Sequence, residues 1–89
     1  MPRYRYRWNT WNVEHIGEHG VSVEEAEFVV DHARRPYPRQ QGERFLVIGQ
    51  TAAGDYIQVA YVFDPPGVVF VIHARPLTDR EKRRYKRRK

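Results

Sequence analysis

The longest unbroken apolar segment of the chain, Val68 to Ile72, predicts a strand that is buried on both faces. It follows a Pro-Pro-Gly turn and ends before Pro76. Because side chains alternate along a strand, His73 and Arg75 are expected to lie on one face at its end. A strand of this kind belongs in the middle of a sheet, so we expect the other strands to pair around it.

Two short helices are predicted in the first half of the chain. Asn12 is the expected N-cap of the first helix, Ile16 lies on its apolar face and Gly20 ends it. Ser22 and Glu25 have the Ser-x-x-Glu spacing of a capping box at the start of the second helix. The apolar residues that follow have the spacing of an amphipathic helix: Ala26, Val29, Val30 and Ala33.

Three further strands are predicted from apolar and polar alternation. Arg3 to Trp8 alternates strictly, so its aromatic side chains are expected to face the core and its arginines the opposite side. Alternatively, these arginines lie on a solvated edge strand, where their charge prevents pairing with another chain. Arg44 to Thr51 and Tyr56 to Phe63 are expected to form strands joined by a hairpin, whereas Pro36 to Gly42 is expected to be a polar loop.

These elements give the order β-α-α-β-β-β-α within a single domain that spans residues 1–89. Three hairpin-linked strands form an antiparallel meander, which the first strand joins across the helical pair. We therefore predict an α+β fold in which an antiparallel sheet carries two helices on one face and leaves the other face open. Thr78 and Glu81 have capping-box spacing at the start of the last helix, and residues 86–89 are expected to form a flexible basic tail.

Composition narrows the chemistry that the chain can perform. It has no cysteine, which excludes disulfides and thiolate metal sites, and no apolar run near the roughly 18 residues of a membrane-spanning helix. We therefore expect a soluble, cytoplasmic protein without a membrane partner.

The net charge of +5 is unevenly distributed along the chain. Residues 9–33 carry six acidic side chains and no Lys or Arg, whereas eight basic residues lie between Arg80 and Lys89. This asymmetry indicates a basic surface for a polyanion and an acidic flank for a basic partner. A solvated acidic helical pair followed by a disordered basic tail is the alternative explanation.

Four residues at the end of the apolar strand and in the last helix have the chemistry to cleave RNA without a metal: His73, Arg75, Glu81 and Tyr85. Such cleavage requires a base for the 2′-OH proton, an acid for the leaving 5′ oxygen and cations that hold the phosphorane. Arg75 has the fork of a phosphate clamp, while His73 and Tyr85 are candidate proton carriers. The structural alternative is that Arg75 pairs with Glu81 and that Tyr85 packs the last helix.

The segment from His15 to His19 matches the H-x-x-E-H pattern of zinc hydrolases. A zinc site needs a third protein ligand and a rigid helix, whereas Gly17 weakens this helix and Gly20 ends it. We therefore interpret His19 as packing against the turn at Gly20, and we expect no metal or other cofactor.

Two motifs frame the chain. The first consists of Trp11-Asn12, His15, His19-Gly20-Val21-Ser22 and Glu24-Glu25-Ala26, and the second of Ile72-His73-Ala74-Arg75, Thr78, Glu81 and Tyr85. In their order and spacing these motifs resemble those of the BrnT family of type II toxins, and the resemblance covers nearly the whole chain. It implies a fold similar to that of RelE-type ribonucleases, metal-independent RNA cleavage and neutralisation by a BrnA-type antitoxin.

By position, the resemblance places the closing Arg, Glu and Tyr of the family on Arg75, Glu81 and Tyr85. The family's Lys-His-Gly falls on residues 18–20, so that an acid replaces the lysine and His19 keeps the histidine. The family's serine before Ala-Arg is replaced by His73.

We predict an endoribonuclease toxin, in which the catalytic residues are Arg75, His73, Tyr85, Glu81 and His19. The basic residues expected to contact RNA phosphates are Arg3, Arg5, Arg7, Arg44, Arg80, Arg83 and Arg84. An antitoxin partner is implied, in an assembly that is a homodimer or a heterotetramer with the antitoxin. The alternative is a non-catalytic protein of the same fold that binds nucleic acid or a partner.

Overall fold

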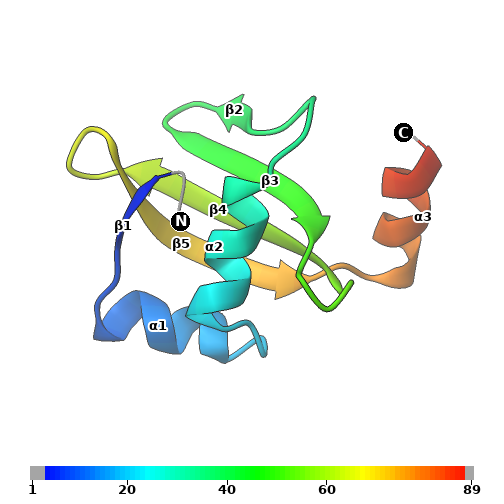
Figure 1. The fold of residues 1–89 in the computed structure, drawn as a ribbon, viewed down its shortest axis with the longest axis horizontal. Helices are drawn as coiled ribbons and strands as arrows, with labels where there is room; N and C mark the ends of the chain where they lie inside the picture. Colours follow the sequence, from blue (N-terminus) through cyan, green and yellow to red (C-terminus); the bar gives the residue numbers. More distant parts are fainter. Residues whose placement is uncertain (1–3, 88–89) are drawn as a thin grey trace.

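The computed structural model of the chain describes residues 4–87, and within them it contains three helices and five strands of an α+β fold (Figure 1). In chain order these elements are β1 (Arg5–Arg7), α1 (Thr10–Gly17), α2 (Val23–Asp31), β2 (Arg39–Gln41), β3 (Arg44–Gln50), β4 (Tyr56–Phe63), β5 (Val68–Pro76) and α3 (Asp79–Arg87). The α+β class predicted from the sequence is confirmed. None of the helices in the described range is long and apolar enough to cross a membrane.

The five strands form one sheet in the order β1-β5-β4-β3-β2. β3, β4 and β5 form the predicted antiparallel meander, but β1 pairs with β5 in parallel, from Arg5 opposite Val68 to Arg7 opposite Phe70. The prediction of a wholly antiparallel sheet is therefore wrong. Two helices and three strands separate β1 from β5 along the chain. A connection of that length allows the two strands to run either parallel or antiparallel.

β2 lies inside the segment that was predicted to be a polar loop, so that prediction is also wrong. Gln41 pairs with Arg44, which leaves a two-residue turn in which Gly42 has a φ of +65°. Only a residue without a Cβ adopts this backbone conformation easily. All three residues of β2 are polar and exposed, so no apolar alternation marks them as a strand.

The apolar core lies between the sheet and α2, which crosses one face of the sheet (Figure 1). Val69 and Val71 of β5 are completely buried on this face, whereas Val68, Phe70 and Ile72 are only partly buried. The prediction that this strand is buried on both faces is thus wrong for its second face, where these three side chains remain partly exposed. The core cluster consists of Ile16, Val21, Ala26, Val29, Val30, Val47, Ile57, Val59, Tyr61, Val69, Val71 and Ala74.

α2 begins as predicted, at a capping box. The Ser22 hydroxyl accepts from the Glu25 backbone N–H at 3.1 Å, and the Glu25 carboxylate accepts from the Ser22 N–H at 2.9 Å. Ala26, Val29 and Val30 are buried, which confirms the predicted apolar face of this helix.

Asn12 joins β1, α1 and β5, and its side chain is completely buried. Its amide nitrogen donates to the carbonyl oxygens of Arg7 and Val71, each at 3.2 Å. Its side-chain oxygen accepts from the Asn9 N–H at 2.7 Å, and the Asn9 side chain accepts from the Asn12 N–H at 3.1 Å. Asn9 is therefore the N-cap of α1, and the assignment of Asn12 to that position is wrong, because Asn12 closes the capping box from the third helical position.

We expect Asn12→Ala to lower the free energy of unfolding by about 2–3 kcal/mol, because it removes two buried hydrogen bonds to carbonyl oxygens and breaks one side of the capping box. Ser22→Ala removes only an exposed N-cap and is expected to cost about 1 kcal/mol. Urea unfolding of the two variants measures both values. A cost for Asn12→Ala no larger than that for Ser22→Ala would show that Asn12 does not hold these elements together.

Candidate functional site

A bulge in β5 determines which side chains reach the open face of the sheet. Val71 pairs with Tyr61 of β4, and His73 pairs with Ala60, so the register leaves Ile72 without a partner. One extra residue reverses the alternation of faces that a regular strand keeps.

This reversal brings His73 and Arg75 out of the core. In an unbroken strand they would share the face of Val69 and Val71, which are completely buried. Instead Ala74 takes the buried position, and His73 and Arg75 are partly exposed on the open face. The prediction that His73 and Arg75 share a face is confirmed.

Three histidines from two parts of the chain meet on this face. The ring centroid of His73 lies 5.2 Å from that of His19 and 5.7 Å from that of His15, and the latter two lie 6.4 Å apart. His15 lies on α1 and His19 in the turn that follows it, so the structure brings His19 to His73. His19 thus contacts His73 in addition to its place in the turn at Gly20, a contact that the sequence interpretation did not include.

Burial lowers the pKa of His73 below its ordinary value of 6.5, and the positive charges of His19, His15, Arg75 and Arg44 lower it further. A lowered pKa favours the neutral imidazole, which is able to accept a proton at neutral pH. His73 therefore has the electrostatic surroundings of a general base.

A depression of about 270 Å³ opens beside His73 on the open face. Its lining residues are Gln41, Arg44, Phe45, Leu46, Gln58, Ala60 and His73. Arg44 supplies a cation and Gln58 an amide, and Gln58 lies directly opposite Arg75 across the β4–β5 pair. This combination of a neutral imidazole, a guanidinium and an amide suits a phosphate group.

Arg75 and Glu81 form a two-pronged ion pair that anchors α3 to the end of β5. Nη1 and Nη2 of Arg75 donate to Oε1 and Oε2 of Glu81 at 2.8 and 2.7 Å, and Nη1 also donates to the Pro76 carbonyl at 3.0 Å. These three bonds use three of the five N–H groups of the guanidinium. The pairing that the structural alternative predicted is thus present, on the same face as His73.

The capping box predicted for the last helix is confirmed. The Thr78 backbone N–H donates to the Glu81 carboxylate at 2.8 Å, and the Glu81 N–H donates to the Thr78 hydroxyl at 3.2 Å. The hydrogen bond from Arg75, followed by that from Thr78, holds the pKa of Glu81 at about 2.

Tyr85 lies one turn after Glu81, and its ring packs near Tyr37 and Tyr56, with centroid distances of 6.2 and 5.7 Å. Burial, followed by these two neighbouring tyrosines, raises the pKa of Tyr85 above 10.0. Its phenol therefore stays neutral near pH 7 and is suited to donate a hydrogen bond. It borders a second depression, of about 190 Å³, lined by Tyr37, Arg39, Leu46, Ile48, Glu81, Arg84 and Tyr85. Leu46 lines both depressions, so they lie side by side.

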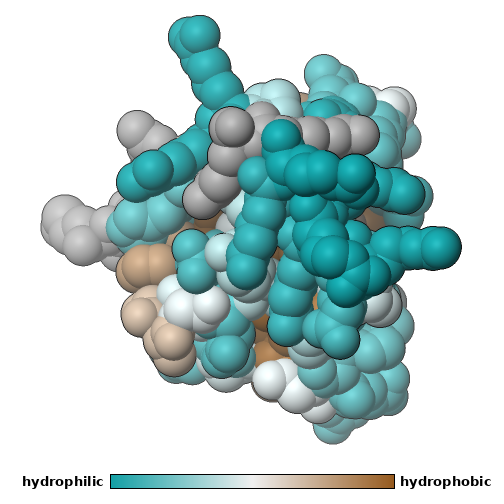
Figure 2. Space-filling model, turned by 90° about the vertical axis from the view of Figure 1, so that its right-hand side faces the viewer, coloured by the Kyte–Doolittle hydropathy of each residue, from teal (hydrophilic) through white to brown (hydrophobic). Residues whose placement is uncertain are grey.

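Six of the nine residues of α3 are Lys or Arg. Figure 2 shows this end of the molecule, where hydrophilic side chains gather over α3. The helix includes Lys86 and Arg87, which were predicted to belong to a flexible tail, whereas residues 88–89 of that tail lie outside the described residues. The Lys86 ammonium lies 5.3 Å from the centroid of the Tyr56 ring. The exposed arginines of the helix include three of the predicted RNA contacts: Arg80, Arg83 and Arg84.

The arginines of β1 differ from one another in their surroundings. Arg7 donates to the carbonyl and the carboxylate of Asp64 at 2.9 and 3.3 Å, and its guanidinium lies 4.0 Å from the centroid of Phe70. Its charge is therefore partly neutralised by Asp64. Arg5 is exposed, and Arg3 lies outside the described residues.

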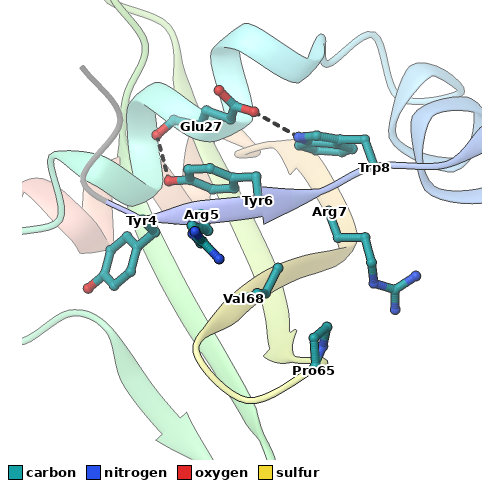
Figure 3. Close-up of a pocket in the computed structure, with 8 residues that line it drawn as sticks. All are labelled: Tyr4, Arg5, Tyr6, Arg7, Trp8, Glu27, Pro65 and Val68. Carbon is teal, nitrogen blue, oxygen red and sulfur yellow. Dashed lines mark hydrogen bonds between the residues drawn. The ribbon is translucent and has the colours of Figure 1, made fainter.

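Tyr6 of β1 and Trp8, which follows the strand, attach this segment to α2. Tyr6 and Trp8 line a depression of about 750 Å³. In Figure 3 these two side chains point toward Glu27, whereas Arg5 and Arg7 point away from it. Trp8 Nε1 donates to the Glu27 carboxylate at 2.8 Å, and the Tyr6 hydroxyl donates to Asp31 at 2.6 Å. Part of the acidic flank thus has a structural role within the chain.

The H-x-x-E-H segment does not form the arrangement of a zinc hydrolase. His15 and His19 contact His73, and within residues 4–87 no group of three or more His, Asp or Glu side chains is placed to hold a metal ion.

No protein-family model, curated protein or solved structure matches the chain. A proposal for the function of this site therefore has to rest on its geometry and on the sequence motifs. Two residues of the site, His15 and Trp11, were not among the predicted site residues. Trp11, His15 and His19 are spaced four residues apart, which places them on one side of α1 and the turn that follows it. This spacing is visible in the sequence and could have identified Trp11 and His15 as site residues.

We expect the Glu81 carboxyl to titrate near pH 2 in the folded protein, and to shift toward its ordinary value of 4.5 in Arg75→Ala. Because the folded pKa is depressed, the ion pair stabilises the fold above about pH 4.5, and this stabilisation is lost as pH falls through about 2. Side-chain carboxyl NMR shifts recorded against pH measure the titration. Arg5→Ala is the control, since Arg5 lies on β1, and an unchanged Glu81 titration in Arg75→Ala would contradict the pairing.

Proposed function

We propose that this protein is a metal-independent endoribonuclease and the toxin of a type II toxin–antitoxin pair. The proposal is carried by one observation, which is that His73 lies beside two other histidines and two residues from Arg75 on an open, basic sheet face. General acid–base cleavage of RNA needs this combination of proton carriers and cations.

In the proposed reaction, neutral His73 takes the proton of a ribose 2′-OH, whose oxygen attacks the adjacent phosphorus. The bond from phosphorus to the 5′ oxygen breaks, and a second histidine of the cluster, His19 or His15, donates the proton that this oxygen takes up. The products are a 2′,3′-cyclic phosphate and a 5′-hydroxyl end. The depressed pKa of His73 and the ring distances of 5.2 and 5.7 Å support this division of roles.

Arg44 and Arg75 supply the positive charge that holds the phosphorane in this proposal. Arg44 borders the depression beside His73, and the bonds of Arg75 to Glu81 and Pro76 use three of its five N–H groups. Glu81 fixes the Arg75 guanidinium through both oxygens and acts as a positioning residue. Tyr85, as a neutral phenol, donates a hydrogen bond at the neighbouring depression.

The resemblance of the two sequence motifs extends the proposal beyond catalysis. It implies membership of the BrnT family, a RelE-like fold and a BrnA-type antitoxin as partner, and the cysteine-free composition adds a cytoplasmic location. The basic surface of α3 supports this assignment, because an acidic partner segment that covered it would also exclude RNA.

A non-catalytic binder of nucleic acid or of a partner is the second candidate. Two observations favour it: Glu81 already occupies both outer nitrogens of Arg75, and Glu18 places an acid where the resembled family has a lysine.

We expect the purified protein to cleave single-stranded RNA in excess EDTA and to leave 2′,3′-cyclic phosphate ends. His73→Ala should reduce the cleavage rate by roughly 10²–10⁴-fold and Arg75→Ala by roughly 10²–10³-fold. His32→Ala is the matched control, because His32 lies at the end of α2 with its ring stacked on Phe28 at 4.1 Å. If the protein binds RNA but does not cleave it, the non-catalytic binder is the correct function and the nuclease proposal fails.

The pH dependence of cleavage tests the role of His73 separately. Since the pKa of His73 lies below 6.5, its basic form persists on acidification, and the rate should decline only below that value. His73→Ser should remove this acidic decline as well as lower the rate. A His73→Ser protein with full activity and the same pH profile would assign the base to another group.

A further inference from the structure

We propose that Trp11 forms a stacking subsite for an unpaired base of single-stranded RNA, adjacent to the histidine cluster. This inference rests on the proposed function, because it names the state of the substrate: the nucleotide next to the reacting one must be unpaired. The subsite belongs to α1, outside the set of residues to which the resemblance gave a role in cleavage.

A continuous series of stacked planar groups leads from β1 to His73. The Arg7 guanidinium lies 4.0 Å from the Phe70 centroid, and the Phe70 and Trp11 rings are 6.0 Å apart with an interplanar angle of 12°. Trp11 and His15 are 5.2 Å apart at 8°, and His15 lies 5.7 Å from His73. The rings of Phe70, Trp11 and His15 are thus nearly parallel, and Trp11 is the most exposed of the three.

Trp11 keeps much of its surface exposed within this series. Its exposed fraction is 53%, the largest among the large hydrophobic side chains of the described residues. Centroid separations of 5.2 and 6.0 Å in nearly parallel planes correspond to offset stacking, which leaves part of the indole open. An exposed, pre-oriented indole is a platform on which a base can stack.

The distance from this platform to the reacting groups suits one substrate strand. Because His15 touches both Trp11 and His73, a base on Trp11 lies one intervening ring away from the proposed general base. The scissile phosphate then lies at the depression that His73 and Arg44 border. A base pair would hold the nucleotide in its duplex, so the subsite selects single strands.

The acidic side chains near Trp11 make a phosphate contact at this subsite unfavourable. Glu14 and Glu18 are exposed on the same segment and repel phosphates, so the contribution of Trp11 is stacking alone. The cations of the proposed phosphate contacts lie on other elements, on β1, β3 and α3. Loss of Trp11 should therefore weaken binding without changing its salt dependence, whereas loss of Arg44 should reduce the salt slope.

The test uses a labelled single-stranded oligodeoxynucleotide, which lacks the 2′-OH and so reports binding without cleavage. Fluorescence anisotropy at several salt concentrations gives the affinity and the slope of log K against log salt. We expect Trp11→Ala to weaken binding roughly 5- to 100-fold with an unchanged slope, and Trp11→Phe to retain most of the affinity. We expect Arg44→Ala to lower the slope by about 0.7.

Val13→Ala is the matched control, since Val13 is also exposed on α1, at 40%, but takes no part in the stacked series. Thermal melts of the three α1 variants check that each remains folded. A probe with one 2-aminopurine base, whose fluorescence falls on stacking, should be quenched by the wild type and by Trp11→Phe but not by Trp11→Ala.

The outcomes separate this inference from the proposed function. If Trp11→Ala binds the oligonucleotide as tightly as Val13→Ala, the subsite is refuted, even where the wild type cleaves RNA. If Trp11→Ala instead loses a concentration-dependent self-association of the wild type, the surface is a protein interface and the subsite is likewise refuted. If the wild type binds through Trp11 but never cleaves RNA, the subsite stands and the nuclease proposal fails.

Discussion

The buried amide of Asn12 is the interaction on which the arrangement of this molecule depends. β1 pairs with β5 for only three residues, from Arg5 to Arg7, and then leaves the sheet. Asn12 continues the junction, since its amide nitrogen donates to one carbonyl of each strand while its oxygen closes the start of α1. Because a buried amide is costly unless it is fully hydrogen-bonded, α1 is fixed beside β5 in one position.

In that position, one side of α1 faces the core and another faces the open side of the sheet. Ile16 enters the core that α2 covers, whereas Trp11 and His15 reach around to the open face of the sheet. The bulge at Ile72 in β5 turns His73 out of the core, onto the same open face that Trp11 and His15 reach. Each feature alone would leave the histidines apart, so the cluster is a property of their combination.

α3 is attached to this site more than to the core. None of its described side chains is fully buried, and it is held by the Arg75–Glu81 pair, its capping box and the tyrosine contacts of Tyr85. The ion pair therefore links the position of a basic helix to a guanidinium beside His73. A partner that displaced α3 would change the charge at the site as well as access to it.

The sequence by itself determined the features that depend on neighbouring residues. Capping boxes at Ser22 and Thr78, the apolar face of α2 and the meander strands all follow from local spacing, and the structure contains them. Tertiary structure alone decided the parallel β1, the polar strand β2, the buried role of Asn12 and the bulge at Ile72. The physical reason is that each of these depends on a partner distant in the chain: a strand direction, a hydrogen-bond acceptor or a register is set by which surface is available to pair. The meeting of His15, His19 and His73 has the same origin, since His19 and His73 are 54 positions apart in the chain and only the fold brings their ring centroids to 5.2 Å.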